Sequence, residues 1–469
     1  MTTPYPDHPQ LNGNYAPIRM ECDIDDVIVR GELPHDLDIT YYRNGPDPQF
    51  PPRRDHHWFA GDGMLHMFNV GNGRVRYRNR WVRTGKWKAE RREGRSLVNP
   101  FNPLQNDRAA RGMEDDGLAN TNIVWHGGKL LALEEGHAPF EIDPDTLDSI
   151  GAWHFGDRLA GPMTAHPKVD PKTGEMLFFG YMASGIFSKD VSYQTVDASG
   201  ALTRSERFKA PFASMMHDFI VTDEHVVFPV FPATASRTRA IRGKPVFAWE
   251  PDKGTHLAVM RRDASVADIR WFETDPCFVF HPMNAYTHGN RIIAHVMQFD
   301  EVPLFPNVDG TPTAPAQARL TEWVIDLAAN ANGVQRRVLD DTTGEFPRLD
   351  ERYAGASYRH GYYAAAAANG NNDLTLNTVV RHDFGGTRHT RYTLPDGDTT
   401  GEPVFVPRSR DAAEGDGYLL SVVHRGRENR SDLAFFDAEN LADGPIACAE
   451  LPHRVPYGFH GNWKYNEVC

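Results

Sequence analysis

The sequence predicts an all-β protein built as a β-propeller, and two features of its 469 residues support this prediction. Short runs rich in Val, Ile, Phe and Tyr recur along the whole chain, separated by Gly, Asp, Asn and Pro, which is typical of strands and turns. Histidines that suit a metal site stand far apart in the sequence, at the edges of such runs. A closed, radial array of sheets points distant residues at one axis, so it accounts for both features.

The expected strands follow one another from one end of the chain to the other. They lie in the ranges 75–83, 122–134, 175–183, 225–231, 291–299, 418–426 and 432–438. The pairs Asp143-Pro144 and Asp170-Pro171 mark turns, because proline fixes φ and removes a backbone donor.

Three segments share a pattern of strand, Asp-containing turn and strand: 140–151, 166–177 and 433–444. Diverged propeller blades leave such a degenerate repeat, although Asp-Pro turns are common in any β protein. Seven blades would take about 67 residues each, and six or eight blades would fit nearly as well.

Two segments, 99–120 and 301–319, look like long loops, and we expect them to cover one face of the propeller. Neither carries a contiguous apolar patch, so stable insertion into a membrane is not expected. No low-complexity linker divides the chain, which indicates one domain over residues 1–469.

Charge and cysteine content narrow the class of protein. The net charge of -13, from 50 basic and 63 acidic residues, argues against binding nucleic acid, which needs a basic surface. The four cysteines, Cys22, Cys277, Cys448 and Cys469, show no CxxC pair and no disulfide framework. The first residues lack a basic and an apolar signal region, and no run reaches the roughly 20 apolar residues of a membrane helix. We therefore expect a soluble, cytoplasmic protein.

Four histidines form the candidate metal set: His166, His217, His281 and His460. They are too far apart for a local zinc finger, so only the fold could bring them together. Four neutral imidazoles suit iron, copper, nickel or zinc, and the ligand type alone does not choose among them. The chain has 21 histidines, most of which must be surface or core residues.

Three glutamates in apolar or strand-like surroundings could orient these histidines: Glu135, Glu345 and Glu402. A ligating histidine usually donates its second ring N–H to a carboxylate or carbonyl. Taken singly, each glutamate could equally be an exposed residue at a strand end. The HExxH, GxSxG and GxxxxGK[ST] motifs and a dinucleotide fingerprint are absent from the sequence.

The motifs resemble those of the carotenoid cleavage oxygenase family along nearly the entire chain. They are GELP (31–34), YYRNGPDP (41–48), HWFAGDGMLH (57–66), TAHP at His166, MMHDF at His217, FHPMNAY at His281, GEPVFVPR (401–408) and the terminal GFHG. The resemblance implies a seven-bladed propeller with a cap of loops and helices over the face that bears the iron.

The resemblance also implies one non-haem Fe(II) per chain, bound by the four histidines above. Glu135, Glu345 and Glu402 would orient His217, His281 and His460 respectively, and His166 would lack a carboxylate partner. Thr121 matches the threonine that crowds one coordination position in several members, which would leave one open position for O2.

Within the family, the segments ANTNIVWHGGKLLALEE, GEFPRLDERYAG and EGDGYLLSVVHRG look closer to bacterial enzymes that cleave lignostilbene and isoeugenol. This implies O2-dependent cleavage of the C=C bond of a stilbenoid or phenylpropanoid, giving two carbonyl products. The alkene supplies all four electrons, so no nicotinamide or flavin is expected. An apocarotenoid-cleaving dioxygenase is the alternative.

The expected substrate contacts depart from this pattern at two positions. Stilbene-cleaving members hold the 4-hydroxyl group of the substrate with a tyrosine and a lysine, and the matching residues here are Phe101 and Glu134. Glu134 would oppose a phenolate, and Phe101 has no hydrogen bond to give. The third residue of this wall, an aromatic one, is Phe59.

Overall fold

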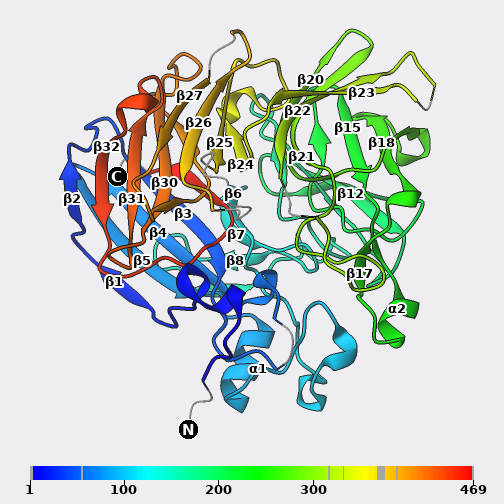
Figure 1. The fold of residues 1–469 in the computed structure, drawn as a ribbon, viewed down its shortest axis with the longest axis horizontal. Coiled ribbons are helices and arrows are strands. Elements are labelled where there is room, and N and C mark those ends of the chain that lie inside the picture. Colours follow the sequence, from blue (N-terminus) through cyan, green and yellow to red (C-terminus); the bar gives the residue numbers. More distant parts are fainter. Residues whose placement is uncertain are drawn as a thin grey trace.

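The computed structural model describes residues 4–53, 56–314, 317–330, 332–366, 375–386 and 389–466. Within them, the strands form seven sheets of four to six strands and one sheet of two strands. The seven larger sheets are the blades of a β-propeller (Figure 1), which confirms the predicted fold class and the number of blades.

Five blades are each made of four antiparallel strands from one continuous part of the chain. In chain order, the first consists of β6 (Asn122–His126), β7 (Lys129–Leu133), β8 (Phe140–Ile142) and β9 (Ser149–Ala152), and the second of β10 (Lys168–Val169), β11 (Met176–Gly180), β12 (Asp190–Val196) and β13 (Leu202–Lys209). The third consists of β14 (Ile220–Val221), β15 (His225–Val230), β18 (Thr255–Arg261) and β19 (Arg270–Thr274), and the fourth of β20 (Phe278–His288), β21 (Arg291–Phe299), β22 (Arg319–Asp326) and β23 (Val334–Asp340). The fifth consists of β24 (Gly344–Leu349), β25 (His360–Ala365), β26 (Thr378–Asp383) and β27 (His389–Thr393).

The other two blades close the ring by joining the two ends of the chain. One contains β1 (Cys22–Ile24), β3 (Ile39–Pro46), β4 (Gly63–Gly71), β5 (Arg74–Trp81) and β33 (Gly461–Tyr465). The other contains β2 (Ile28–Gly31), β28 (Thr399–Thr400), β29 (Val404–Pro407), β30 (Gly417–Arg425), β31 (Arg430–Asp437) and β32 (Pro445–Glu450). The last strand, β33, pairs with β3, and β2 pairs with β32, so each of these blades combines N-terminal and C-terminal strands (Figure 1).

The three Asp-containing segments form hairpin turns, as the sequence indicates. Asp143 Oδ1 accepts the amide hydrogens of Asp145 and Thr146 between β8 and β9. Asp170, between β10 and β11, and Asp437, the last residue of β31, accept the amide hydrogens of the residues that follow them in the same way. These turns do not occupy equivalent places in their blades, because the second joins the first two strands of a blade whereas the first joins the last two.

Helices and loops outside the blades cover one end of the propeller. Helices α1 (Gly85–Glu93) and α2 (Arg237–Ile241) lie in the lower part of Figure 1. The small sheet pairs β16 (Ala233–Ala235) with β17 (Phe247–Trp249), which is labelled above α2. The segments 99–120 and 301–319, of which residues 315 and 316 lie outside the described part, contribute Phe101, Asp116 and Leu304 to the wall of a cavity of about 990 Å³. The cap therefore consists of loops and short helices, as expected.

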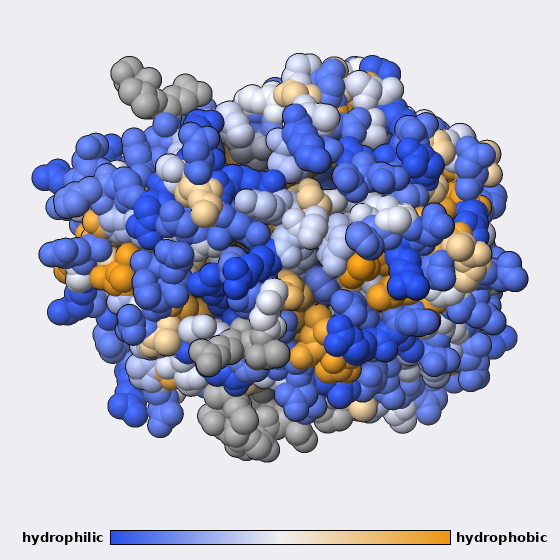
Figure 2. Space-filling model, turned by 90° about the horizontal axis from the view of Figure 1, so that it is seen from above, coloured by the Kyte–Doolittle hydropathy of each residue, from blue (hydrophilic) through white to orange (hydrophobic). Residues whose placement is uncertain are grey.

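Large apolar side chains pack between the blades, where neighbouring sheets face one another. Trp323, Tyr41 and Tyr193 are among the largest fully buried side chains. The face drawn in Figure 2 is largely hydrophilic, with apolar side chains in separate patches. Among the described residues, no helix has the length and apolar character needed to cross a bilayer. Cys22, Cys277 and Cys448 are free thiols, whereas Cys469 lies outside the described residues.

Candidate metal centre and cavities

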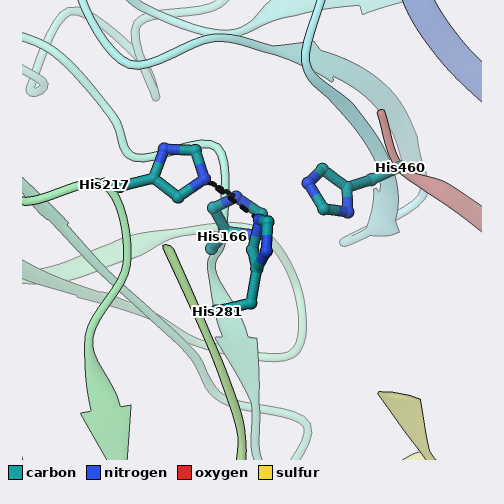
Figure 3. A group of neighbouring side chains, drawn as sticks. All are labelled: His166, His217, His281 and His460. Carbon is teal, nitrogen blue, oxygen red and sulfur yellow. Dashed lines mark hydrogen bonds between the residues drawn. The ribbon is translucent and has the colours of Figure 1, made fainter. Parts of the chain in front are cut away.

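The structure brings the four predicted histidines together at the propeller axis. His281 lies in β20, His460 directly precedes β33, and His166 and His217 precede β10 and β14 by a few residues. These strands belong to four different blades, and Figure 3 shows the four rings turned toward one another. All four side chains are buried, and one potential ligand atom of each lies within 4.8 Å of those of the others.

A carboxylate contacts the outer nitrogen of three of the rings. Glu345 Oε2 lies 2.5 Å from His281 Nδ1, and Glu402 Oε1 lies 2.9 Å from His460 Nδ1. Glu135 Oε1 contacts His217 Nδ1. Each glutamate thus lies against the histidine with which the family resemblance pairs it.

The fourth histidine, His166, has a different neighbour. Its Nδ1 lies 3.9 Å from Asp218 Oδ2, which is too far for a hydrogen bond. The carboxylate of Asp218 is instead held by Lys168 at 2.8 Å and by the backbone amide of Phe219. Among the residues that the structure describes, His166 therefore has no hydrogen-bonded carboxylate on Nδ1, as the resemblance implies.

The protonation of these rings favours a bound cation. Burial holds the pKa of His281 well below its usual value, so the ring is neutral and carries one proton. In His281 that proton lies on Nδ1, facing Glu345, which leaves its Nε2 as a lone pair. Glu135 contacts Nδ1 of His217 in a similar way, and Nε2 of His217 faces Nε2 of His281. The two Nε2 atoms are only 3.1 Å apart. Two imidazole nitrogens this close at the propeller axis are a suitable pair of ligand atoms, so a metal ion fits this arrangement.

The spacing of the nitrogens also fits a metal. His166 Nε2 lies 3.0 Å from His217 Nε2, close to the 3.1 Å between His217 and His281 (Figure 3). Two nitrogens that are each about 2.1 Å from one ion are about 3.0 Å apart at a right angle and about 3.4 Å apart at the tetrahedral angle. The spacing matches right-angled positions, and the neutral imidazole set suits Fe(II).

The charge around the histidines calls for a cation as well. Glu345 Oε1 is buried without a hydrogen-bond partner among the described residues, and burial raises the pKa of Glu345 to about 8. Burial also opposes ionisation of Glu402, but the adjacent Arg348 and His460 hold its pKa at about 2. With a divalent ion and three carboxylates the cluster would carry about -1. Arg348, 3.1 Å from Glu402, brings it to neutrality.

Two residues of the centre have left-handed backbone conformations. His217 has φ 47° and Phe346 has φ 57°. Such conformations cost a non-glycine residue of the order of 1 kcal/mol and persist where the surrounding structure holds them. The amide of Phe346 donates to Glu345 Oε2, and the ring of Phe346 stacks on His281. The local backbone therefore fixes the position of His217 and that of the Glu345 carboxylate, which contacts His281.

A cavity of about 990 Å³ extends from the metal centre toward the cap. Its walls include His217, His281 and His460 and all four remaining residues that the sequence singles out: Phe59, Phe101, Thr121 and Glu134. The ring of Phe59 packs on Phe280, and Phe280 packs on His217. The aromatic wall is therefore continuous with the histidine cluster.

Thr121 is fixed through its backbone to the metal centre. Its amide donates to the carbonyl of Leu133, and its own carbonyl accepts the amide of His460 at 3.2 Å. Its hydroxyl donates to Asn120 Oδ1 at 2.9 Å. With that hydroxyl engaged, Thr121 is held rigidly beside His460.

A second cavity, of about 950 Å³, borders the cluster at His166, His281 and His460. Charged side chains such as Lys168, Asp218 and Arg262 make up more of its lining than of the lining of the first cavity, although aromatic residues such as Trp125 and Trp463 line it too. An aromatic ligand would bury its rings more favourably in the first cavity.

Sequence reasoning missed two residues that hold the orienting glutamates. The hydroxyl of Tyr181 donates to Glu135 Oε2 at 2.5 Å, and Arg348 reaches Glu402 and the carbonyl of Gly461. Tyr181 follows an apolar strand and looks like a core residue. The position of Arg348 depends on an irregular register between β24 and β25, at Glu345 to Arg348, which no sequence pattern predicts.

Replacing Arg348 by methionine is expected to weaken iron binding about 10- to 100-fold, as loss of a residue that supports a ligand typically does. The variant loses the cation beside Glu402 and the bond to Gly461, next to His460. Competition with a chelator would measure the change. Arg352→Met is the matched control, because Arg352 pairs with Asp350 instead. Equal iron affinity in the two variants would show that Arg348 does not support the centre.

Comparison with known proteins places these features in a family. The model of the family described as retinal pigment epithelial membrane protein (RPE65) matches residues 15–465. The chain is 38% identical to isoeugenol monooxygenase of Pseudomonas nitroreducens, over 97% of this chain and 98% of that protein. It is also 38% identical to lignostilbene-α,β-dioxygenase isozyme III of Sphingomonas paucimobilis, over 98% and 97% respectively. The crystal structure of Pseudomonas brassicacearum lignostilbene dioxygenase superposes with a TM-score of 0.95 at 35% identity, covering 99% of this chain and all of that one.

Proposed function

The chain belongs to the RPE65, or carotenoid oxygenase, family, and from this membership we propose that it cleaves the C=C bond of a stilbenoid or phenylpropanoid with O2. It is a non-haem iron oxygenase, and the products are two carbonyl compounds. The whole of residues 1–469 serves this activity as one domain. We place the enzyme in the cytoplasm.

One observation carries the proposal: four buried histidines with bare nitrogens lie at the end of an aromatic cavity of about 990 Å³. The histidines suit iron, and the cavity suits an aryl alkene. His166, His217, His281 and His460 hold the ion, while Glu135, Glu345 and Glu402 fix the tautomers of three of them. When bound, iron supplies the binding and activation of O2.

The residues of the chain bind and orient the substrate and exclude water. The alkene itself supplies the four electrons that O2 needs, because each alkene carbon becomes a carbonyl carbon. Phe59 and Phe101 provide flat apolar walls for the aryl group. Phe280 and Phe346 pack against His217 and His281, so the reacting bond would lie in a site shielded from water. Thr121, fixed beside His460, narrows the space on that side.

Product analysis tests the proposed function. Iron-loaded protein is given air and, in separate reactions, 4-hydroxystilbene, isoeugenol or an apocarotenal, and the products are identified by mass spectrometry. We expect aromatic aldehydes from 4-hydroxystilbene or isoeugenol. Reactions under ¹⁸O2 would show whether one or both product oxygens come from O2.

The same experiment distinguishes the alternative activity, cleavage of an apocarotenoid, from cleavage of an aryl alkene. Cleavage of the apocarotenal alone would move the substrate class to polyenes and would contradict the aryl-alkene proposal. The replacement of a tyrosine and a lysine by Phe101 and Glu134 is the feature that favours this alternative. Iron-free, folded protein that cleaves as fast as the loaded form would contradict the role of iron in either activity.

A further inference from the structure

A cluster of three ionisable side chains lines the aromatic cavity without touching the metal centre. His137 Nε2 lies 2.8 Å from Asp116 Oδ1, and His137 Nδ1 contacts Glu134 Oε1. The other oxygen of Glu134 accepts the amide of Leu118 at 3.0 Å. All three side chains border the same cavity as Phe59 and Phe101.

The geometry fixes the charge of this cluster. Each ring nitrogen of His137 faces a carboxylate, so both nitrogens are protonated and the ring is an imidazolium. Burial alone would lower the pKa of His137, but Glu134 and Asp116 raise it to about 11. Two carboxylates and one imidazolium leave a net charge of about -1.

Neighbouring cations do not cancel this charge. Lys86 acts on Asp116 from a distance, but its ammonium is bound to Asp62 at 2.7 Å and to Glu90 at 2.9 Å. Asp115 lies close by as well, and its carboxylate accepts the amides of Gly85 and Gly117. The surroundings of Asp116 therefore add negative charge, not positive charge.

The cluster offers hydrogen-bond acceptors to a ligand. His137 Nε2 is bonded to Asp116 and its Nδ1 lies against Glu134 Oε1, so the polar atoms of the cluster left for a ligand are mainly carboxylate oxygens, each of which can accept more than one hydrogen bond. Phe101 packs with Phe59 and Phe247 and has no polar atom on its ring. A ligand in this part of the cavity thus meets apolar walls and negatively charged acceptors.

We propose that the Glu134–His137–Asp116 cluster recognises the aryl end of the substrate and selects an uncharged hydrogen-bond donor, a phenol that stays protonated, over a phenolate or a carboxylate. This inference rests on the proposed function and names the substrate class of the same site. A phenol O–H donates well to a carboxylate, and such bonds are stronger than those between neutral groups. A phenolate or an aryl carboxylate would meet the like charge of the two carboxylates.

The selection has consequences for binding. 4-Hydroxystilbene should bind to the iron-loaded enzyme without O2 about 10-fold more tightly than 4-methoxystilbene, which lacks the donor. 4-Carboxystilbene should bind more weakly than either, because it brings a negative charge. Quenching of protein or stilbene fluorescence would give the three dissociation constants.

The ionisation of a bound phenol tests the inference directly. A 3,5-difluoro-4-hydroxystilbene, whose phenol ionises near neutral pH, reports its own charge by its absorbance. Bound to the anaerobic, iron-loaded wild type, it should hold its proton to a higher pH than in water by about one pKa unit, a 10-fold change in the phenol to phenolate ratio. Glu134→Gln should reverse most of this shift, and Glu134→Lys should favour the phenolate.

Two further variants secure the result. Glu141→Gln is the control, because it removes the same charge from a glutamate of the same blade that pairs with Lys129 and does not line the cavity. It should leave the spectrum of the bound probe unchanged. Asp116→Asn removes the second carboxylate from a loop and replaces Glu134→Gln as the test if that variant does not fold. The ionisation of the probe bound to Asp116→Asn should shift in the same direction as that of the probe bound to Glu134→Gln.

Several outcomes would overturn the inference: a probe that binds as phenolate to the wild type, one that does not bind, or one whose ionisation is the same in every cavity variant. Cleavage of 4-hydroxystilbene together with any of these results would refute the recognition role and leave the proposed function standing. Conversely, cleavage of an apocarotenal alone would refute the proposed function, whatever the spectrum of the probe.

Discussion

Replacing His281 by alanine is expected to remove iron and alkene-cleaving activity together. Nε2 of His281 lies 3.1 Å from Nε2 of His217, and Glu345 contacts Nδ1 of His281. His281 also borders both cavities. Loss of an outer partner alone typically weakens metal binding 10- to 100-fold, so loss of a ligand should reduce activity about 1,000-fold or more. Metal analysis of the purified variant and the rate of aldehyde formation would measure the two effects.

A buried histidine of the adjacent strand provides the control. His295 lies in β21, next to the strand of His281, and its Nδ1 lies 2.9 Å from the hydroxyl of Tyr358. His295→Ala should lower the stability of the protein yet leave the iron content near one per chain. Activity that survives in iron-free His281→Ala would show that the histidine cluster is not the reaction centre.

The four histidines could be predicted from the sequence because each lies at or near a strand close to the propeller axis. Such strands are short and apolar, and a polar side chain at their edge stands out, as in the residues around His217 and His281. The pairing of Glu402 with His460 follows from the resemblance and not from spacing. In the structure it depends on β33, which joins a blade made mostly of N-terminal strands.

Other parts of the site depend on contacts that the sequence does not display. Glu134 stood out as an unusual residue, but its partners His137 and Asp116 come from a turn after β7 and from a cap loop. Side chains of such loops meet only after the cap has packed on the blades. For the same reason, the sequence gives no sign that Lys168 and Asp218 pair beside His166.

Replacing Lys86 by methionine is expected to destabilise the protein by about 3–5 kcal/mol, because it leaves two buried carboxylates without their cation. Lys86 Nζ lies 2.7 Å from Asp62 and 2.9 Å from Glu90, and all three side chains are at most 4% exposed. The midpoint of urea unfolding would measure the loss. Lys209→Met is the control, because the pair of Lys209 with Asp190 is exposed on the lysine side and should be worth less than about 1 kcal/mol.

The same substitution should also reach the substrate cavity, through the cap. Glu90 Oε1 accepts the amides of Leu97 and Val98, and this fixes the start of the segment that carries Phe101 into the cavity wall. Without Lys86, Glu90 would turn toward water or take up a proton, and the segment would lose its anchor. We therefore expect KM for an aryl alkene to rise several-fold while iron binding is unchanged. Normal stability together with an unchanged KM would show that the ion pair neither stabilises the cap nor positions Phe101.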